Sequence, residues 1–559
     1  MGDATATQRA MPVASRGPRG PTSPLASVAI VVAALVLVPV AAVIAQMFGP
    51  ATSTWAHLVA TVLPEYMQNT VVLLLGVGVG VALVGTLTAW LVTTFRFAGS
   101  SVLEWALVLP LAMPAYVVAY AYTDTLQFAG PVQGFIRDVT GWHAREYWFP
   151  EIRSLGGAVG LFILTLYPYV YLVARAAFLE QTAATLEAAR LLGASRIGMF
   201  VRVGLPLARP AIVAGMALAM METLADFGTV AYFGVPTFST GIYRAWFSLG
   251  DPHAASQLAL VMLLFVLAIL AIERALRGRA RQHERGIRRH VAHEPLRGVA
   301  GALAVAACAA PVLLGFVVPA AILLRMAVRY GDAQFGPRFV ELTINSFSLA
   351  GIAAVAAVAL ALLVAYAARI SRGRSVVFAA RTAGIGYALP GSIIAVGVLI
   401  PLTALDNALA SWLRTHFGVA AGLLLTGSIA ALVYAYVVRF LGVALQTVTA
   451  GLAKITPAMD DASRSLGVGA GATLARVHLP LLRGSVFTAA LLVFVDVMKE
   501  LPATFVMRPF NFDTLAVQAY NLAADERLSE AATASLVIVA AGLVPIIVIS
   551  RVIRRSRGP

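Results

Sequence analysis

Residues 187–206 have the sequence EAARLLGASRIGMFVRVGLP, and residues 461–480 have the sequence DASRSLGVGAGATLARVHLP. A constant shift of 274 positions aligns the two stretches without a gap, and the shift continues to match residues further along the chain. Matched pairs are Gly193 and Gly467, Arg202 and Arg476, Leu205 and Leu479, Pro206 and Pro480, Arg209 and Arg483, and Asp251 and Asp525. A repeat of this length indicates an internal duplication, so we predict two similar halves, each built around one polar loop.

The composition indicates that these halves lie in a membrane. Hydrophobic residues make up 60% of the chain and charged residues only 12%, a balance that soluble globular proteins rarely show. Apolar runs of about 20 residues, long enough to cross a bilayer as a helix, recur along the chain. We therefore predict an all-α integral membrane protein with about twelve transmembrane helices in two tandem six-helix halves. The expected spans lie near 27–48, 70–95, 102–123, 156–177, 207–231, 254–275, 299–325, 343–368, 376–401, 420–443, 481–506 and 529–551.

The predicted halves occupy residues 27–275 and 299–551, with their polar loops at 181–206 and 455–480. Residues 276–298 form a basic linker between the halves. Residues 1–26 are rich in Gly, Pro, Ser and Thr, which is typical of a disordered tail, and residues 552–559 form a second tail.

The arginines indicate which side of the membrane each loop occupies. They gather near the N-terminus, in both polar loops, in the linker and in the last residues, whereas the loops between them carry far fewer. The positive-inside rule therefore places both termini, the linker and both polar loops in the cytoplasm. This distribution accounts for the net charge of +15 without nucleic acid, so we expect no nucleic-acid partner.

Two scarce residue types exclude several kinds of site. Cys308 is the only cysteine, which excludes an intramolecular disulfide and a multi-cysteine metal site. Lys454 and Lys499 are the only lysines, and neither follows a glycine-rich loop of the kind that binds nucleotide phosphates. If ATP drives this protein, another chain hydrolyses it. No cluster of carboxylates or cysteines accompanies the linker histidines, so a solvated basic segment is favoured over a metal site.

The repeated loop resembles the EAA loop of binding-protein-dependent ABC importer permeases. In that family the loop contains Glu-Ala-Ala, three further residues, a glycine, and a spacer that ends at Leu-Pro or a similar pair. The first loop matches at Glu187, Ala188, Ala189, Gly193 and Pro206, and the second at Asp461, Ala462, Gly467 and Pro480. The second loop departs from the pattern with Asp in place of Glu and Ser463 in place of the second Ala.

The resemblance implies a short coupling helix in each loop that docks on a cytoplasmic ATP-binding subunit, expected as a homodimer. It further implies an extracytoplasmic binding protein that delivers the solute, and a multi-pass location in the lipid of the bacterial cytoplasmic (inner) membrane. This chain would bind no cofactor, since ATP and Mg²⁺ would bind the partner ATPase. No second permease chain would be required because the two halves are fused.

The residue types of the loops fit such a helix. An acid in the first turn favours the helix dipole, and Gly193 and Gly467 allow a tight turn or the close approach of another backbone. Pro206 and Pro480 fit the first turn of the next span, where a missing N–H costs little. An ordinary interfacial helix–turn–helix is the alternative, and repetition at identical spacing argues against it.

Four acidic residues within predicted spans form a second candidate site. Glu222 and Asp226 correspond under the same shift to Asp496 and Glu500. Each pair is spaced i and i+4, which predicts that its members share one helix face. Ionisable groups within spans are costly and usually face a polar cavity or pair with one another. Two interpretations stay open: the acids line a cation path, or Asp496 pairs structurally with Lys499.

The substrate is suggested by the segments that follow the acids. Residues 226–251 (DFGTVAYFGVPTFSTGIYRAWFSLGD) and 500–528 (ELPATFVMRPFNFDTLAVQAYNLAADERL) resemble the matching regions of fused permeases for ferric iron. Hard trivalent cations prefer carboxylate and phenolate oxygens, and Tyr232, Tyr243 and Tyr520 are nearby in sequence. Permeases for thiamine or 2-aminoethylphosphonate share the coupling loops and stay as alternatives. An ion-driven secondary transporter is less favoured, and no catalytic motif supports a membrane enzyme.

The predicted orientation is testable by thiol labelling. In a Cys308→Ala background, Gln282→Cys should resist a membrane-impermeant thiol reagent in intact cells, because the linker is predicted to be cytoplasmic. A cysteine in a loop on the opposite side serves as the positive control. Equal labelling at both positions would contradict the orientation.

Overall fold

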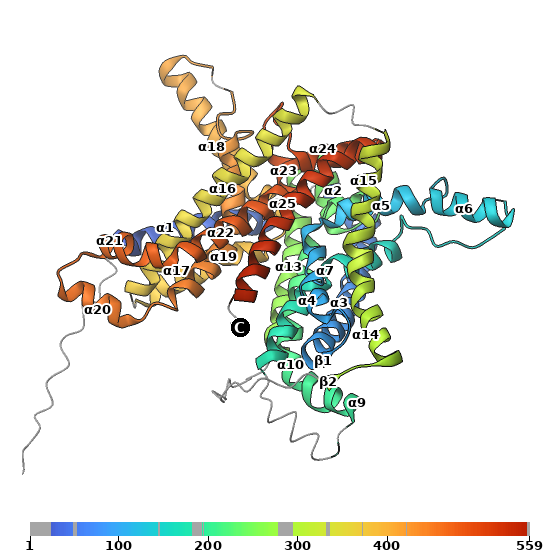
Figure 1. Cartoon of the computed structure of the whole chain (residues 1–559). Coiled ribbons are helices and arrows are strands. Elements are labelled where there is room, and N and C mark those ends of the chain that lie inside the picture. The colour runs from blue at the N-terminus through green and yellow to red at the C-terminus, as the bar shows by residue number, and fades with distance from the viewer. Residues whose placement is uncertain are drawn as a thin grey trace, which may run out of the picture.

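The computed structural model describes residues 24–48, 53–143, 146–180, 193, 195–277, 294–330, 336–371, 373–420 and 422–555. Nearly all secondary structure in these residues is helical, and the strands β1 (Phe95–Arg96) and β2 (Glu294–Pro295) form one short parallel pair. Eleven helices in the described ranges are long and apolar enough to cross a membrane, and a bent helix pair raises the number to twelve. The predicted all-α membrane fold is confirmed (Figure 1).

The elements of the two halves follow the shift found in the sequence. Those of the first half are α1 (Pro24–Ala45), η1 (Gln46–Phe48), α2 (Ser53–Thr61), α3 (Leu63–Thr94), α4 (Ser100–Ala106), η2 (Leu109–Ala112), α5 (Ala115–Leu126), α6 (Pro131–Thr140), α7 (Leu155–Glu180), α9 (Arg196–Met199), η3 (Phe200–Gly204), α10 (Leu205–Ala225), α11 (Gly228–Tyr232), α12 (Phe238–Tyr243), η4 (Arg244–Ser248) and α13 (Pro252–Arg277).

Those of the second half are α14 (Gly298–Val312), η5 (Leu313–Val317), α15 (Val318–Tyr330), α16 (Pro337–Ile370), α17 (Arg374–Ala383), η6 (Ile385–Ala388), α18 (Gly391–Phe417), α19 (Ile429–Leu452), α20 (Pro457–Ser465), α21 (Ala470–Thr473), η7 (Leu474–His478), α22 (Leu479–Met498), α23 (Pro502–Met507), α24 (Leu515–Ala524) and α25 (Leu528–Arg555). The long helices α3 and α16 begin 274 residues apart, as do the short helices α11 and α23. The duplication is therefore one of structure as well as of sequence.

The first helix of each half packs against the other half. Helix α1 lies against α16, α17 and α18, while α14 and α15 lie against α3, α4 and α5 (Figure 1). Pro39 within α1 has no N–H to bond the carbonyl of Leu35, and the Tyr434 hydroxyl donates to that carbonyl at 2.7 Å. Because the first helix of each half packs on the other half, the two halves interlock in space.

Prolines break the third predicted span of each half. Pro114 and Pro390 force the preceding residues, Met113 and Leu389, into extended backbone, because the proline ring disfavours helical geometry there. The first half consequently bends by 92° between residues 100–112 and 115–140. The helices predicted near 102–123 and 376–401 are therefore broken, and the span of the second half shifts to α18, which runs on to Phe417.

Candidate functional site

The second coupling loop contains the predicted short helix, α20. Thr456 occupies its N-cap position, and Gly467 ends it with a left-handed φ of 73°. The N–H of Gly467 bonds the carbonyl of Arg464, and the N–H of Val468 bonds the carbonyl of Ser463. These are the two bonds of a Schellman motif, in which a glycine closes the helix and satisfies its last carbonyls.

The acid in the first turn of α20 is Asp460, not Asp461. Asp460 lies 2.8 Å from Nε2 of the fully buried His478, and it accepts a hydrogen bond of 3.0 Å from Nε of Arg369. The same guanidinium donates to the carbonyls of Leu452 and Ile455 at the end of α19. This network fixes α20 on the membrane helices, whereas Asp461 is exposed and pairs with Arg464 on the helix surface.

Most of the first coupling loop lies outside the described residues, including Glu187, Ala188 and Ala189. Gly193 is described, and its φ of 78° is close to that of its counterpart Gly467. Both glycines occupy the left-handed region that residues with a Cβ rarely adopt, so the two loops turn in the same way at this position.

The prolines that end the loops lie in the first turns of α10 and α22, as predicted. The helical stretch also continues upstream of each proline, over residues 196–225 in the first half and 470–498 in the second. A π-helical turn precedes each proline, with the N–H of Leu205 bonded to the carbonyl of Phe200 and that of Leu479 to that of Leu474. Wider turns of this kind let a helix accept an interior proline.

The four membrane acids do not share uninterrupted helix faces as predicted. Helix α10 ends at Ala225, and Asp226 has extended backbone with a ψ of 135°. Helix α22 ends at Met498, just before Glu500. Pro502 lies in the first turn of α23, where its missing N–H costs little. In the first half Gly228 occupies the matching position, and a Cβ there would lie 2.9 Å from that of Tyr116.

The later acid of each pair caps the short helix that follows the break. Asp226 accepts from the backbone N–H groups of Thr229 and Val230 at 2.9 and 3.3 Å. Glu500 accepts from those of Ala503 and Thr504, both at 3.0 Å. Capping satisfies N–H groups that the helix itself leaves unpaired, so Asp226 and Glu500 are held by the fold.

Arg439 of α19 adds an ion pair to Glu500 that sequence reasoning missed. Its Nη1 lies 2.9 Å from Oε1 of Glu500, whose side chain is only 2% exposed. Gly391, at the start of α18, packs so closely that a Cβ there would lie 2.1 Å from the guanidinium. A lone arginine in an apolar span was a readable signal for such a partner. The position that matches Arg439 in the first half is Thr165, so Asp226 has no equivalent cation.

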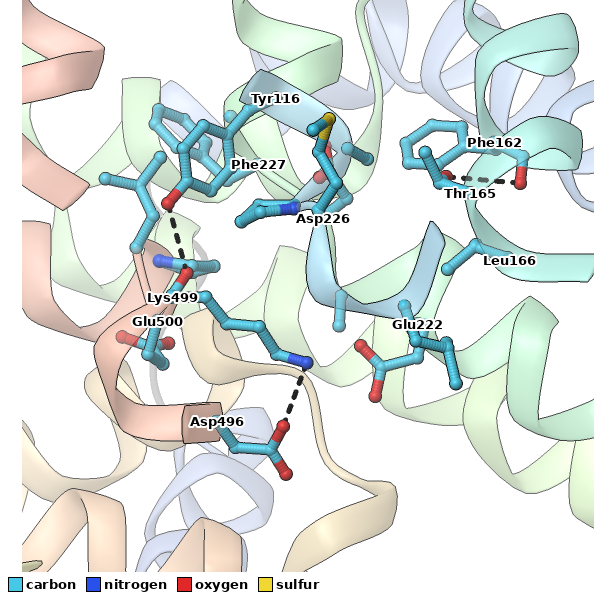
Figure 2. Close-up of a pocket in the computed structure, with 18 of the residues that line it drawn as sticks. Tyr116, Phe162, Thr165, Leu166, Glu222, Asp226, Phe227, Asp496, Lys499 and Glu500 are labelled. Carbon is cyan, nitrogen blue, oxygen red and sulfur yellow. Dashed lines mark hydrogen bonds and ion pairs between the residues drawn. The ribbon is translucent and has the colours of Figure 1, made fainter. Parts of the chain in front are cut away.

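The earlier acid of each pair faces a cavity between the halves. Glu222 and Asp496 line a cavity of about 110 Å³ together with both capping acids. The Lys499 ammonium lies 2.9 Å from Oδ1 of Asp496, on the side that faces Glu222 (Figure 2). The predicted Asp496–Lys499 pair is thus confirmed as a contact. Tyr387, which the sequence did not single out, donates to Glu222 at 3.5 Å.

A larger cavity of about 610 Å³ adjoins the first one. The two cavities share the lining residues Leu111, Tyr169, Tyr387, Asp496 and Lys499. The larger cavity is also lined by α4 and by the last turns of α19. These elements lie beside the ends of α3 and α19 that contact the coupling-loop segments. The space therefore extends from the acids toward the coupling loops.

Aromatic rings from both halves pack together on the opposite side of the acids. Phe227 stacks on Tyr243 at 4.0 Å between ring centroids, and Phe505 contacts Tyr243 and Tyr520 at 5.3 and 5.4 Å. Tyr243 and Tyr520 were predicted near the path, and they lie in this aromatic cluster. Tyr232 lies elsewhere, where its hydroxyl accepts from Arg153 at 2.9 Å.

The Arg153 side chain also bridges the halves. It makes a two-pronged contact with the Glu526 carboxylate at 2.8 and 3.0 Å. The Glu526 side chain is 58% exposed and neither residue lines the two cavities, so this pair joins the halves outside them. Among the described residues, no group of three or more His, Cys, Asp or Glu side chains is arranged to hold a metal ion.

Residues 82–282, which include the first coupling loop and the acids Glu222 and Asp226, match the model of a family described as binding-protein-dependent transport system inner membrane component. The molybdenum transport system permease protein ModB of Escherichia coli is 30% identical over 195 residues, which cover 34% of this chain and 82% of ModB. The chain belongs to this permease family.

Longer relatives match both halves of the permease. The Fe(3+)-transport system permease protein FbpB 2 of Haemophilus influenzae is 25% identical over 493 residues, which cover 87% of this chain and 90% of that protein. A probable ABC transporter permease, y4fN of Sinorhizobium fredii, is 24% identical over 480 residues, with 81% and 80% covered. The fused two-half organisation therefore occurs in these relatives too.

The two kinds of acid should respond differently to neutral substitution. Glu500→Gln leaves the buried Arg439 without its charged partner, which should cost on the order of 3 kcal/mol and lower the midpoint of thermal unfolding. Glu222→Gln serves as the matched control, because Glu222 caps no helix and faces the cavity, and its midpoint should stay near that of the wild type. Equal losses in the two purified variants would contradict the division of roles.

Proposed function

We propose that this permease moves ferric iron, delivered by an extracytoplasmic binding protein, across the cytoplasmic membrane into the cell. The similarity to an Fe(3+)-transport permease over 87% of the chain carries the proposal. The cavity between the halves supports it, since its lining contains four carboxylates against two basic side chains, Arg439 and Lys499. Carboxylate and phenol oxygens are the ligands that hard trivalent cations prefer.

The same lining argues against an oxyanion substrate. Relatives such as ModB and the sulfate permease CysT of Escherichia coli are named for molybdenum and sulfate transport. An oxyanion in this cavity would meet an excess of negative charge, and like charges at close range repel. The excess of carboxylates in this cavity therefore favours a cationic cargo.

Energy would enter through the two coupling loops. A separate ATPase homodimer with Mg²⁺ and ATP would bind α20 and its first-half counterpart on the cytoplasmic side, where the positive-inside rule places both termini. The matched left-handed glycines, Gly193 and Gly467, support two equivalent docking surfaces. In the coupling helix of the second half, Ala462 and the exposed Asp461 would face the ATPase.

The cavities suggest the step of the cycle that this state represents. Space extends from Asp496 toward the coupling loops, while the aromatic cluster closes the other end. Closure of the ATPase dimer would draw the coupling helices together, part the aromatic cluster and admit iron to Glu222 and Asp496. Hydrolysis would then return the permease to this state and release iron into the cytoplasm.

Coupling can be tested with the two matched glycines. Gly193→Asp/Gly467→Asp should leave the protein in the membrane and abolish uptake, because a Cβ is strained at positive φ and bulk and charge enter the docking surface. Gly141→Asp, also at positive φ but far from the loops, controls for backbone strain. Wild-type stimulation of ATPase activity by loaded binding protein in the double variant would refute the coupling assignment.

The cargo can be identified with the transporter reconstituted with its ATPase and binding protein. ATP-dependent accumulation of ⁵⁵Fe(III) should exceed that of thiamine, 2-aminoethylphosphonate and molybdate by at least about tenfold, a difference that corresponds to about 1.4 kcal/mol. Thiamine is the sharpest comparison because it is also a cation. Accumulation of another solute with no iron uptake would overturn the ferric assignment while leaving the permease family unchanged.

A further inference from the structure

We propose that the ammonium of Lys499 is a covalently tethered counter-ion that occupies the cation path when no cargo is bound. A trivalent cation must displace it from Asp496 and Glu222. The inference rests on the proposed transport of ferric iron. It assigns Lys499 a specificity role: its ammonium occupies the path against cations of low charge.

The position of the ammonium is the first argument. Lys499 and Asp496 line both cavities, so their ion pair lies where the two spaces meet. The ammonium reaches toward the gap between Asp496 and Glu222, which come from different halves (Figure 2). A cation that passes from one cavity to the other therefore has to take the place of this charge.

The asymmetry of the repeat is the second argument. Under the shift that relates Glu222 to Asp496, the counterpart of Lys499 is Ala225. Helices α10 and α22 end within one residue of equivalent positions, so the break itself does not need a lysine. One ammonium serves a pair of carboxylates that the duplication placed on opposite sides of the cavity.

The contrast with Arg439 is the third argument. Glu500 is 2% exposed and is held by Arg439 and two backbone N–H groups, an arrangement that cannot open without breaking the cap of α23. The side chains of Lys499 and Asp496 are 30% and 20% exposed, and one contact of 2.9 Å between Nζ and Oδ1 joins them. A lysine is a compact charge on a flexible stem, which suits a pair that must separate and reform.

Charge explains the selectivity. At equal distance and dielectric, a trivalent ion interacts with a carboxylate about three times as strongly as an ammonium does. A monovalent ion gains no such advantage, and it must also replace a partner that is covalently tethered nearby. Iron can therefore displace the ammonium where abundant monovalent cations cannot.

The test uses the complete transporter, purified with its ATPase, and Mn²⁺ as the probe. Binding of Mn²⁺ is followed by electron paramagnetic resonance in the resting state, whose larger cavity gives access to the ion pair. Lys499→Met should create a saturable Mn²⁺ site that binds at least about tenfold more tightly than any site in the wild type, since two uncompensated carboxylates attract cations. Adding Glu222→Gln to Lys499→Met should abolish that site. Absence of the new site in a folded Lys499→Met protein would overturn the proposal.

Lys499→Arg provides an independent test of the proposal. It retains the ion pair, so it can be measured even if Lys499→Met does not fold. A guanidinium makes stronger two-pronged contacts with carboxylates, so a counter-ion that must be displaced would leave more slowly. We expect iron uptake to fall about tenfold with unchanged thermal stability and no Mn²⁺ site. A purely structural pair predicts wild-type uptake, which would overturn the proposal. If the wild type itself takes up no iron, the proposed function fails instead, whatever the Mn²⁺ measurements show.

Discussion

The rest of the structure depends on how two helices end inside an apolar bundle. Helices α10 and α22 stop at Ala225 and Met498, in surroundings where an unpaired backbone N–H is costly. Asp226 and Glu500 supply the acceptors that the following short helices require. Acids placed to cap α11 and α23 bring negative charge to the centre of the protein, and the earlier acids, Glu222 and Asp496, extend that charge into the cavity.

The duplication and the exchange of first helices between the halves bring the two helix breaks together at one shared site. The first helix of each half packs on the other half, so the paired breaks face each other across a common cavity. The halves differ at two positions that matter electrostatically, since Arg439 and Lys499 correspond to Thr165 and Ala225. One added cation locks a capping acid and the other occupies the space between the cavity acids. The two halves are thus alike in backbone structure, and these two side chains make the acids of the second half differ in role from those of the first.

Much of this arrangement was predictable from the sequence. The hydrophobic runs fixed the membrane fold, and the constant shift identified the duplication, the acids and the paired glycines. The pairing of Lys499 with Asp496 was also predictable because the residues are three positions apart. The division into capping acids and cavity-facing acids was not predictable. The i, i+4 spacing in the sequence continues through Asp226 and Glu500, although the helices end before them. A lone arginine in an apolar span indicates a charged partner, but Arg439 reaches Glu500 across 61 positions, so no local pattern identifies which acid it is. The first-turn position of Pro206 was predictable, but the π-helical turn that precedes it was not.

Alternating access through the space between the halves is the central claim of this account. It is tested most directly by the accessibility of the aromatic cluster, with Phe505→Cys introduced in a Cys308→Ala background of the reconstituted transporter. An impermeant thiol reagent on the side away from the coupling loops should fail to label this cysteine in the resting state. It should label it after the ATPase is trapped closed with ATP and vanadate. Equal labelling in both states would contradict the account.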